Sequence, residues 1–446
     1  MERNTLLDAL LDEAGMSYSG LAKRVNDRGK QSGKHLRYDH SSVIRWISKG
    51  QRPRSPAPEL ICEVMADQLE RPVSLDDIGM GNPGAAQQPS TPLHGFINRS
   101  TALWRGDFQQ RKDVESAPVI TGLPAVGPVW EWENPPDDTD VSRRGTPQVG
   151  ADDVGVLRTA RGHYEQMYRT TGGVTTKTRV VHFLNQEVAP LLRGAYTDPV
   201  GRELHRAAGG LAAVAGICSY DADAQGLAQR YFYQALRLAK ASGDRGFGGY
   251  VIALLVNQSL YLHEYRQAVA FAEAGLRTAG AHITHALATD LYAMQAKAFA
   301  RMGDQNGAHR CMTLAEQAVG RIRRDEEPAE TGYVQPGLVE VQFAEALMSL
   351  GDMGPAQKFA REAVRAQAHT RGRVHRLATL TNVDLRKGDA EQAAATAMEM
   401  VGTAQGIESQ RLRDRFRSVR QTLAEHGNTA TAEAAEQIDD ALRFPL

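Results

Sequence analysis

A short phrase recurs along the second half of the chain: a turn, then an alanine near the start of an amphipathic helix. Successive alanines are 40, 40, 48 and 37 residues apart, at Ala228, Ala268, Ala308, Ala356 and Ala393. Repeats of this length are typical of helical hairpins that stack into a solenoid, because one hairpin cannot bury its apolar face alone. The repeat therefore predicts an all-helical domain over residues 153–446.

The last three copies of the turn share a Gly-Asp step, at Gly303, Gly351 and Gly388 with the aspartate that follows each. We expect the glycine to take the left-handed conformation at the end of one helix and the aspartate to cap the next. The pattern resembles tetratricopeptide repeats, although its period is longer and its signature residues are degenerate. Residues 410–423 are charged on most faces and are expected to form a capping helix.

Composition supports an all-α protein. Apolar residues make up 42% of the 446 residues but aromatic residues only 6%, which favours helices over sandwiches or barrels. The three cysteines lie far apart, which argues against a disulfide framework or a zinc site. The sequence shows neither a membrane-spanning apolar run nor a secretory leader, so we expect a cytoplasmic protein without membrane contact.

Residues 1–79 predict a separate helical bundle, with apolar residues at helical spacing over 5–14, after Ser17, and over 41–49 and 58–69. The third helix has an apolar stripe formed by Val43, Trp46 and Ile47. Its second stripe, predicted to face outward, is formed by Ser42, Arg45 and Lys49. This layout is that of a helix-turn-helix domain, whose second motif helix enters the major groove of DNA.

Local charge favours double-stranded DNA as the partner. Residues 20–54 hold ten Lys or Arg and two acidic residues, whereas the whole chain has a net charge of −1. We expect base contacts from His40, Ser41, Ser42 and Arg45. We expect phosphate contacts from Lys23, Lys34, Arg37, Lys49, Arg52 and Arg54. The alternative is a structural bundle whose charges only solvate its surface.

Two segments depart from regular helix. Residues 26–38 replace the short turn of a minimal helix-turn-helix, and they either follow the phosphate backbone or form an ordinary loop. Residues 80–152 are rich in proline and glycine, which predicts a partly irregular linker. Within it, Trp130 and Trp132 are expected, together with Trp104, to pin the linker onto a neighbouring domain.

The N-terminal residues resemble a known family. Residues 14–17, 21–26, 36–39, 42–46 and 52–54 resemble the helix-turn-helix of actinobacterial transcriptional regulators, which are related to the Xre/Cro–CI class and carry tetratricopeptide-like C-terminal repeats. Phrases in the repeat region, such as residues 226–232 and 293–304, extend the resemblance. The resemblance implies a regulator, often a negative one, of development, sporulation and antibiotic production.

We therefore predict a sequence-specific transcriptional repressor that acts as a homodimer. No catalytic or metal-ligand motif is found, so no enzymatic activity, metal or cofactor is expected. The repeat domain is expected to sense a ligand or partner through a groove containing Asn257, Gln258 and Tyr261; alternatively, these amides satisfy carbonyls between hairpins. Two other hypotheses remain: a peptide-responsive regulator of the quorum-sensing type, and a scaffold that does not bind DNA.

Overall fold

The computed structural model describes residues 3–31, 34–54, 56–69, 73, 75, 77–80 and 93–443. These residues are mostly helical, and their β-pairing is limited to two isolated bridges, Arg143 with Tyr196 and Gln148 with Ala195. The predicted all-α class is thus confirmed. The chain divides into two compact units, Met1–Arg105 and Gly106–Leu446, and each is described by itself.

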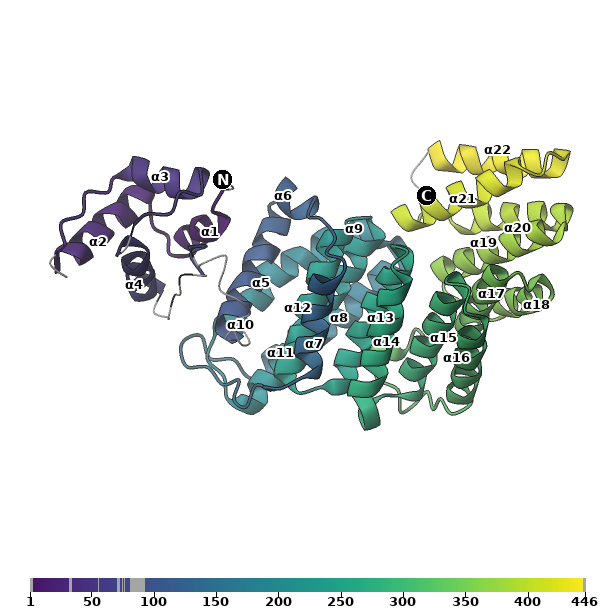
Figure 1. The fold of residues 1–446 in the computed structure, drawn as a ribbon, viewed down its shortest axis with the longest axis horizontal. Helices are drawn as coiled ribbons and strands as arrows, with labels where there is room; N and C mark the ends of the chain where they lie inside the picture. The colour runs from purple at the N-terminus through teal and green to yellow at the C-terminus, as the bar shows by residue number, and fades with distance from the viewer. Residues whose placement is uncertain are drawn as a thin grey trace. The chain divides into compact units, whose positions relative to one another are not determined.

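Unit 1 is a small bundle in which α2 packs against both α3 and α4 (Figure 1). Its helices are α1 (Thr5–Glu13), α2 (Tyr18–Gln31), α3 (His40–Ser48), α4 (Ala57–Leu69) and the first part of α5 (Leu93–Phe108). One apolar core joins the first four helices, and its fully buried members include Leu7, Leu21, Val43, Ile61 and Met65.

The end of α3 is tied to the start of α1 through Asn4. The Asn4 side chain accepts a hydrogen bond from the Leu7 N–H at 3.1 Å and so caps α1. Its amide also donates to the Ile78 carbonyl at 2.8 Å, and its backbone N–H donates to the Ile47 carbonyl at 2.7 Å. The last two bonds join distant parts of the unit, and the bond to Ile47 helps to fix α3 on the bundle.

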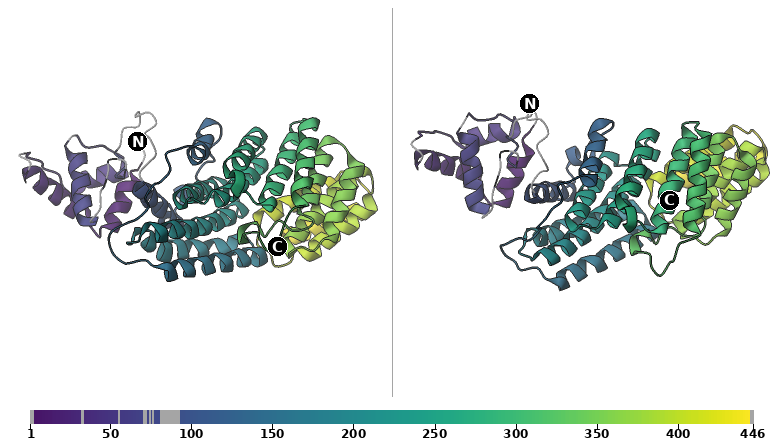
Figure 2. Two further views of the ribbon diagram at one scale, coloured as in Figure 1. Left: turned by 90° about the horizontal axis from the view of Figure 1, so that it is seen from below. Right: turned by 60° about the horizontal axis from the view of Figure 1, so that its bottom comes forward.

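Unit 2 is built from helical hairpins that stack one after another (Figures 1 and 2). It begins with α6 (Lys112–Glu115), α7 (Leu123–Glu133), α8 (Ala151–Thr171), α9 (Gly173–Phe183) and α10 (Ala189–Arg193). The hairpins that follow are α11 (Asp198–Asp221) with α12 (Gln225–Ser242), α13 (Arg245–Tyr261) with α14 (Tyr265–Ala279), α15 (His285–Arg301) with α16 (Gln305–Val319), α17 (Leu338–Leu350) with α18 (Met353–Arg365), α19 (Thr370–Lys387) with α20 (Ala390–Thr403), and α21 (Gln410–Ala424) with α22 (Thr429–Arg443).

The repeated turn has one geometry at all five copies. A residue with positive φ stands five positions before each repeat alanine, and all five alanines are completely buried. The predicted left-handed glycines are confirmed at Gly303, Gly351 and Gly388, with φ of 79°, 88° and 91°. Asp223 and His263 take this conformation in the first two copies, since both types tolerate it better than bulky residues do.

The aspartate caps were predicted too broadly. Asp304 caps α16, because its carboxylate accepts from the Gly307 N–H at 2.8 Å. Asp352 and Asp389 make no such bond at the starts of α18 and α20. Asp389 instead accepts from the side-chain amide of Gln357 at 2.8 Å. A cap position alone therefore did not decide which partner the carboxylate takes.

The prediction that residues 410–423 form the capping helix is also corrected. Helix α21 (Gln410–Ala424) is followed by α22 (Thr429–Arg443), so α21 does not end the repeat.

The segment predicted as an irregular linker is largely ordered, although residues 81–92 lie outside the described residues. It contains α5, α6 and α7, and residues 117–138 lie along α12 and α14. Gln229 exchanges two 2.8 Å hydrogen bonds with the backbone of Ile120, and Arg237 binds Asp138 at 2.7 Å. Proline and glycine content concealed these specific anchors, because composition reports local propensity rather than tertiary contacts.

The tryptophans of this segment behave differently from one another. Trp132 is 1% exposed and its indole lies against Gly248, where an added Cβ would come within 2.3 Å of the ring nitrogen. Trp104 is also fully buried. Trp130 is 60% exposed, so the prediction that it pins the segment is wrong. Its position two residues before Trp132 turns it to the opposite side of α7.

Candidate nucleic-acid interface

Helix α3 begins with a reciprocal cap between Asp39 and Ser42. The Asp39 carboxylate accepts from the Ser42 N–H at 2.8 Å and from the Ser42 hydroxyl at 2.7 Å. The same hydroxyl lies 3.4 Å from the Asp39 N–H, which completes a capping box. The Ser42 hydroxyl and N–H together hold the pKa of Asp39 below its usual value. The carboxylate is thus ionised at neutral pH and fixes the start of the helix.

This cap corrects the predicted outward stripe. Ser42 is only 6% exposed and its hydroxyl is committed to Asp39, so Ser42 is not available for a base contact. Ser42, Val43, Trp46 and Ile47 form the buried side of α3. Of the predicted outward stripe, only Ser42 is wrong, since Arg45 and Lys49 are exposed. A small polar side chain can serve the helix terminus instead of facing outward.

The outward side of α3 is formed by Ser41, Ile44, Arg45 and Ser48. Ile44 is 38% exposed and belongs to neither of the two stripes predicted from the sequence. Arg45 is exposed, and its Nη2 donates to the Ser42 hydroxyl at 3.3 Å. This face contains no acidic side chain. It combines one guanidinium, hydroxyls and one apolar group, which are the side-chain types that read guanine edges and thymine methyls.

Helix α2 continues to Gln31, so the predicted insert over residues 26–38 is too long: its first residues are helical, and the described part outside helix is residues 34–38, which we now call the insert. This insert is held firmly on α2. Asn26 donates to the Tyr38 carbonyl at 2.8 Å and accepts from the Tyr38 N–H at 2.9 Å. Tyr38 in turn packs edge-on against Trp46, with ring centroids 4.9 Å apart. Leu36 lies over Gly29, where an added Cβ would come within 2.7 Å of it. Gly29 therefore permits the insert to approach α2 closely.

Alternation along the insert turns its cationic side chains outward. Leu36 and Tyr38 pack against the core. Arg37, which lies between them, is exposed, and so are Lys34 and His35 before them. Successive residues of an extended segment point to opposite sides. Residues 34–38 consequently present positive charge beside the start of α3.

The other predicted phosphate contacts are exposed too. Lys49, Arg52 and Arg54 follow the end of α3, and Lys23 lies on α2. His40, which was predicted as a base contact, is the first residue of α3 and is exposed, with its ring 5.6 Å from that of Tyr18. Cationic side chains therefore stand at both ends of α3. Two arginines of the basic stretch are used otherwise: Arg24 donates to Gln68, and Arg28 pairs with Asp67 and lies 4.0 Å from Glu63.

The predicted groove residues of unit 2 are engaged within the unit. Gln258 is 2% exposed and donates to the Gln225 carbonyl at 2.8 Å, so it serves the alternative role of satisfying a carbonyl between hairpins. The Tyr261 hydroxyl donates to Asp414 at 3.2 Å. Asn257 is partly exposed. The three residues therefore do not form one free binding surface.

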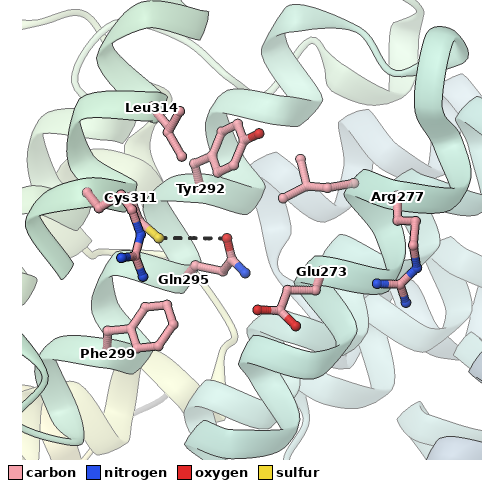
Figure 3. A pocket seen from close by; sticks show the side chains of 9 residues that line it. Glu273, Arg277, Tyr292, Gln295, Phe299, Cys311 and Leu314 are labelled. Carbon is pink, nitrogen blue, oxygen red and sulfur yellow. Dashed lines mark hydrogen bonds between the residues drawn. The ribbon is translucent and has the colours of Figure 1, made fainter. Parts of the chain in front are cut away.

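A separate hollow of about 440 Å³ opens between α14, α15 and α16 (Figure 3). Its polar lining includes Glu273, Tyr292, Gln295 and Arg310, and none of the predicted groove residues belongs to it. Cys311 lies at this hollow and donates to the Gln295 side chain at 3.8 Å. Burial raises the pKa of Cys311 to about 11, which keeps the thiol protonated and unreactive at neutral pH.

Comparison with known proteins finds one family match within unit 1. A family model described as the SP15 N-terminal domain matches residues 7–81, and these residues contain α2, α3, α4 and most of α1. No curated protein matches the chain. Among the helices that the structure describes, none is long and apolar enough to cross a membrane. Nor do the described His, Cys, Asp and Glu residues gather into a group that could hold a metal ion.

Proposed function

We propose that unit 1 binds double-stranded DNA with sequence specificity and that the protein regulates transcription. The observation that carries this proposal is the outward face of α3, where Arg45 and Ile44 are exposed between cationic segments at both ends of the helix. A helix presented in this way can enter the major groove while the flanking side chains reach phosphates.

The charge distribution supports the same proposal. Arg24 and Arg28 are engaged with α4, so the basic stretch is not simply a uniformly solvated surface. Five other cations flank α3: Lys34 and Arg37 lie before it, and Lys49, Arg52 and Arg54 lie after it. Phosphate contacts from two sides fix the register of a protein on the duplex, and base contacts from the enclosed helix then give specificity.

Repression and dimerisation belong to the same proposal. The resemblance of the N-terminal residues to actinobacterial regulators favours a repressor of development or antibiotic production. Proteins of the helix-turn-helix class bind as dimers to two half-sites one helical turn apart. We therefore propose that unit 2 supplies the dimer contact, which would place two copies of α3 on one face of the duplex.

Selection from a random library of double-stranded DNA tests the proposal. The full chain is expected to enrich one motif, arranged as two half-sites whose centres lie about 10 base pairs, or a multiple of this, apart. Binding at low salt without enrichment of any motif would leave only non-specific attraction to DNA. Absence of binding at about 50 mM salt would contradict the proposal and favour a scaffold, since phosphate contacts are strong there.

A further inference from the structure

Three arginines meet inside unit 2, and together we call Arg371, Arg411 and Arg415 the arginine cluster. Arg371 comes from α19, and its guanidinium lies over the ring of Tyr168 at 4.8 Å. Arg411 comes from α21, and its guanidinium lies over Tyr220 at 3.9 Å and near Tyr261 at 5.2 Å. The aromatic rings fix the planes of these guanidinium groups by cation–π contact.

The carboxylates near the arginine cluster already have several donors each. Asp221 pairs with Arg371 and also accepts from the Ser409 hydroxyl and the Gly173 N–H, at 2.7 and 2.8 Å. Glu345 accepts from Lys297 at 2.6 Å and lies 3.3 Å from Arg415. Four cations, counting Lys297, thus share two carboxylates. The neighbouring Asp414 is bound by Arg417 at 2.5 Å and adds no net charge.

Two nitrogens of the cluster lack acceptors. Nη1 of Arg371 and Nε of Arg411 are buried without a hydrogen-bond partner among the described residues, and Arg371 is only 8% exposed. A buried donor to which nothing binds costs free energy, more so when it is charged. Arg415 keeps 28% of its side chain exposed, so this member of the cluster meets solvent.

Two histidines nearby are neutral, chiefly because of burial, and the neighbouring arginines add to the effect. Burial, with added repulsion from Arg169, Arg371 and Arg376, lowers the pKa of His369 to about 4. Burial lowers the pKa of His375 as well, and Arg415 lowers it further despite the opposing charge of Glu345. Both rings are therefore neutral at pH 7. The net positive charge of the arginine cluster favours binding of an anion.

We propose that the arginine cluster binds a small oxyanion that carries at least two negative charges. Phosphate and carboxylate groups share the required chemistry, because either can accept two parallel N–H bonds from a planar guanidinium. This inference does not depend on DNA binding by unit 1. The competing role is purely structural: the cluster and the adjoining 3.1 Å bond from the Glu408 N–H to the Thr171 carbonyl would only join α8 to the last hairpins.

Isothermal titration of the full chain with pyrophosphate and, separately, with malonate tests the proposal, at fixed ionic strength and without DNA. We expect saturable binding of at least one anion at a single site. Preference for pyrophosphate would identify a phosphate ligand, and preference for malonate a carboxylate ligand. Arg411→Gln should weaken binding about tenfold or more, as expected for a lost charged hydrogen bond.

Two further variants separate binding from folding. Arg411→Lys keeps the charge but loses the planar fork, and it is expected to bind with intermediate affinity. Arg266→Gln makes the same charge change as Arg411→Gln at an exposed position on α14, and it should bind like the wild type. Absence of saturable binding of both anions, or equal affinity in the wild type and folded Arg411→Gln protein, would overturn the proposal and leave the cluster structural.

Discussion

The Asp39 carboxylate accepts two hydrogen bonds from Ser42, one from its N–H at 2.8 Å and one from its hydroxyl at 2.7 Å. This pair fixes where α3 starts, and the start of a helix fixes which residues face outward one turn later. Ser42 therefore orients the face that carries Ile44 and Arg45, although it does not belong to that face.

Ser42→Ala should reduce stability and leave base recognition intact. The variant loses the part-buried hydrogen bond of the Ser42 hydroxyl, and a typical intramolecular hydrogen bond is worth about 1 kcal/mol. For a unit of this size the melting temperature should fall by roughly 4–8 °C. Thermal unfolding of the variant and competition binding below its melting temperature check this. Altered sequence preference in the folded variant would return Ser42 to the base-reading face.

Arg45→Ala should leave stability intact and weaken base recognition. Arg45 is exposed and contributes little to the core, so the melting temperature is expected to change little. Loss of a bidentate contact to guanine should reduce discrimination at one base pair by about 1–3 kcal/mol. Binding to the selected site and to its single-base variants measures this. Ile44→Ala is the companion variant, and it should relax preference for thymine at a neighbouring position.

Phosphate contacts are tested by the salt dependence of binding. Arg37→Ala and Arg54→Ala should each flatten the log–log dependence of affinity on salt by about 0.9, and weaken all sequences alike. Arg24→Ala is the matched control, because this guanidinium is engaged by Gln68 on α4, and its slope should equal that of the wild type. Slopes equal to that of the wild type in the Arg37→Ala and Arg54→Ala variants would make these arginines ordinary solvated charges.

The repeat turns give a test of stability. Gly388 has a φ of 91° and no atom within 4 Å of an added Cβ, so Gly388→Ala acts through backbone strain alone and should cost about 1 kcal/mol. Gly402 also has open space around it but lies within helix α20. Gly402→Ala should therefore stabilise by up to about 1 kcal/mol. Chemical denaturation gives both values, and equal effects would refute the turn geometry.

Buried His205 predicts a loss of stability in mild acid. Burial lowers the pKa of His205 to about 4, and its bond to the Gly201 carbonyl only partly opposes this. The unfolded ring takes up a proton below its ordinary pKa of about 6.5, whereas the folded ring stays neutral. The contribution, about 3 kcal/mol at most, is complete above pH 6.5 and is lost as the pH falls towards 4.

The pH dependence of unfolding checks the role of His205. His205→Leu removes the titrating ring, so the free energy of unfolding should fall less between pH 6.5 and 4 in the variant than in the wild type. The two curves would run parallel if His205 were charged in the folded protein.

Sequence reasoning succeeded where a structural requirement is local. The left-handed residue and the buried alanine of each repeat stand five positions apart, and one turn and one helix start determine both. Sequence reasoning failed where the conformation depends on a partner that is distant in the sequence. Asp389 binds Gln357 from another hairpin, and residues 117–138 gain order from Gln229 and Arg237 on α12.

The same distinction between local and distant determinants applies to the residues predicted to face DNA. Exposure of Arg45 followed from helical periodicity, and Lys34 and Arg37 were predicted as phosphate contacts from the basic charge of their segment. The burial of Ser42 did not, because periodicity assigns a small polar residue to the outside unless its bond to Asp39 is recognised. The arginine cluster was beyond sequence reasoning, since Arg371, Arg411 and Tyr220 come together only when α19 and α21 meet α11.

The central claim, that α3 reads DNA, is tested most directly by genome-wide footprinting of the full chain on DNA from its source organism, with Arg45→Ala in parallel. The wild-type chain should protect discrete sites that share the motif selected in vitro, and those sites should lose protection in the variant while weak non-specific binding persists. Uniform protection, or identical discrete sites for both chains, would contradict the account.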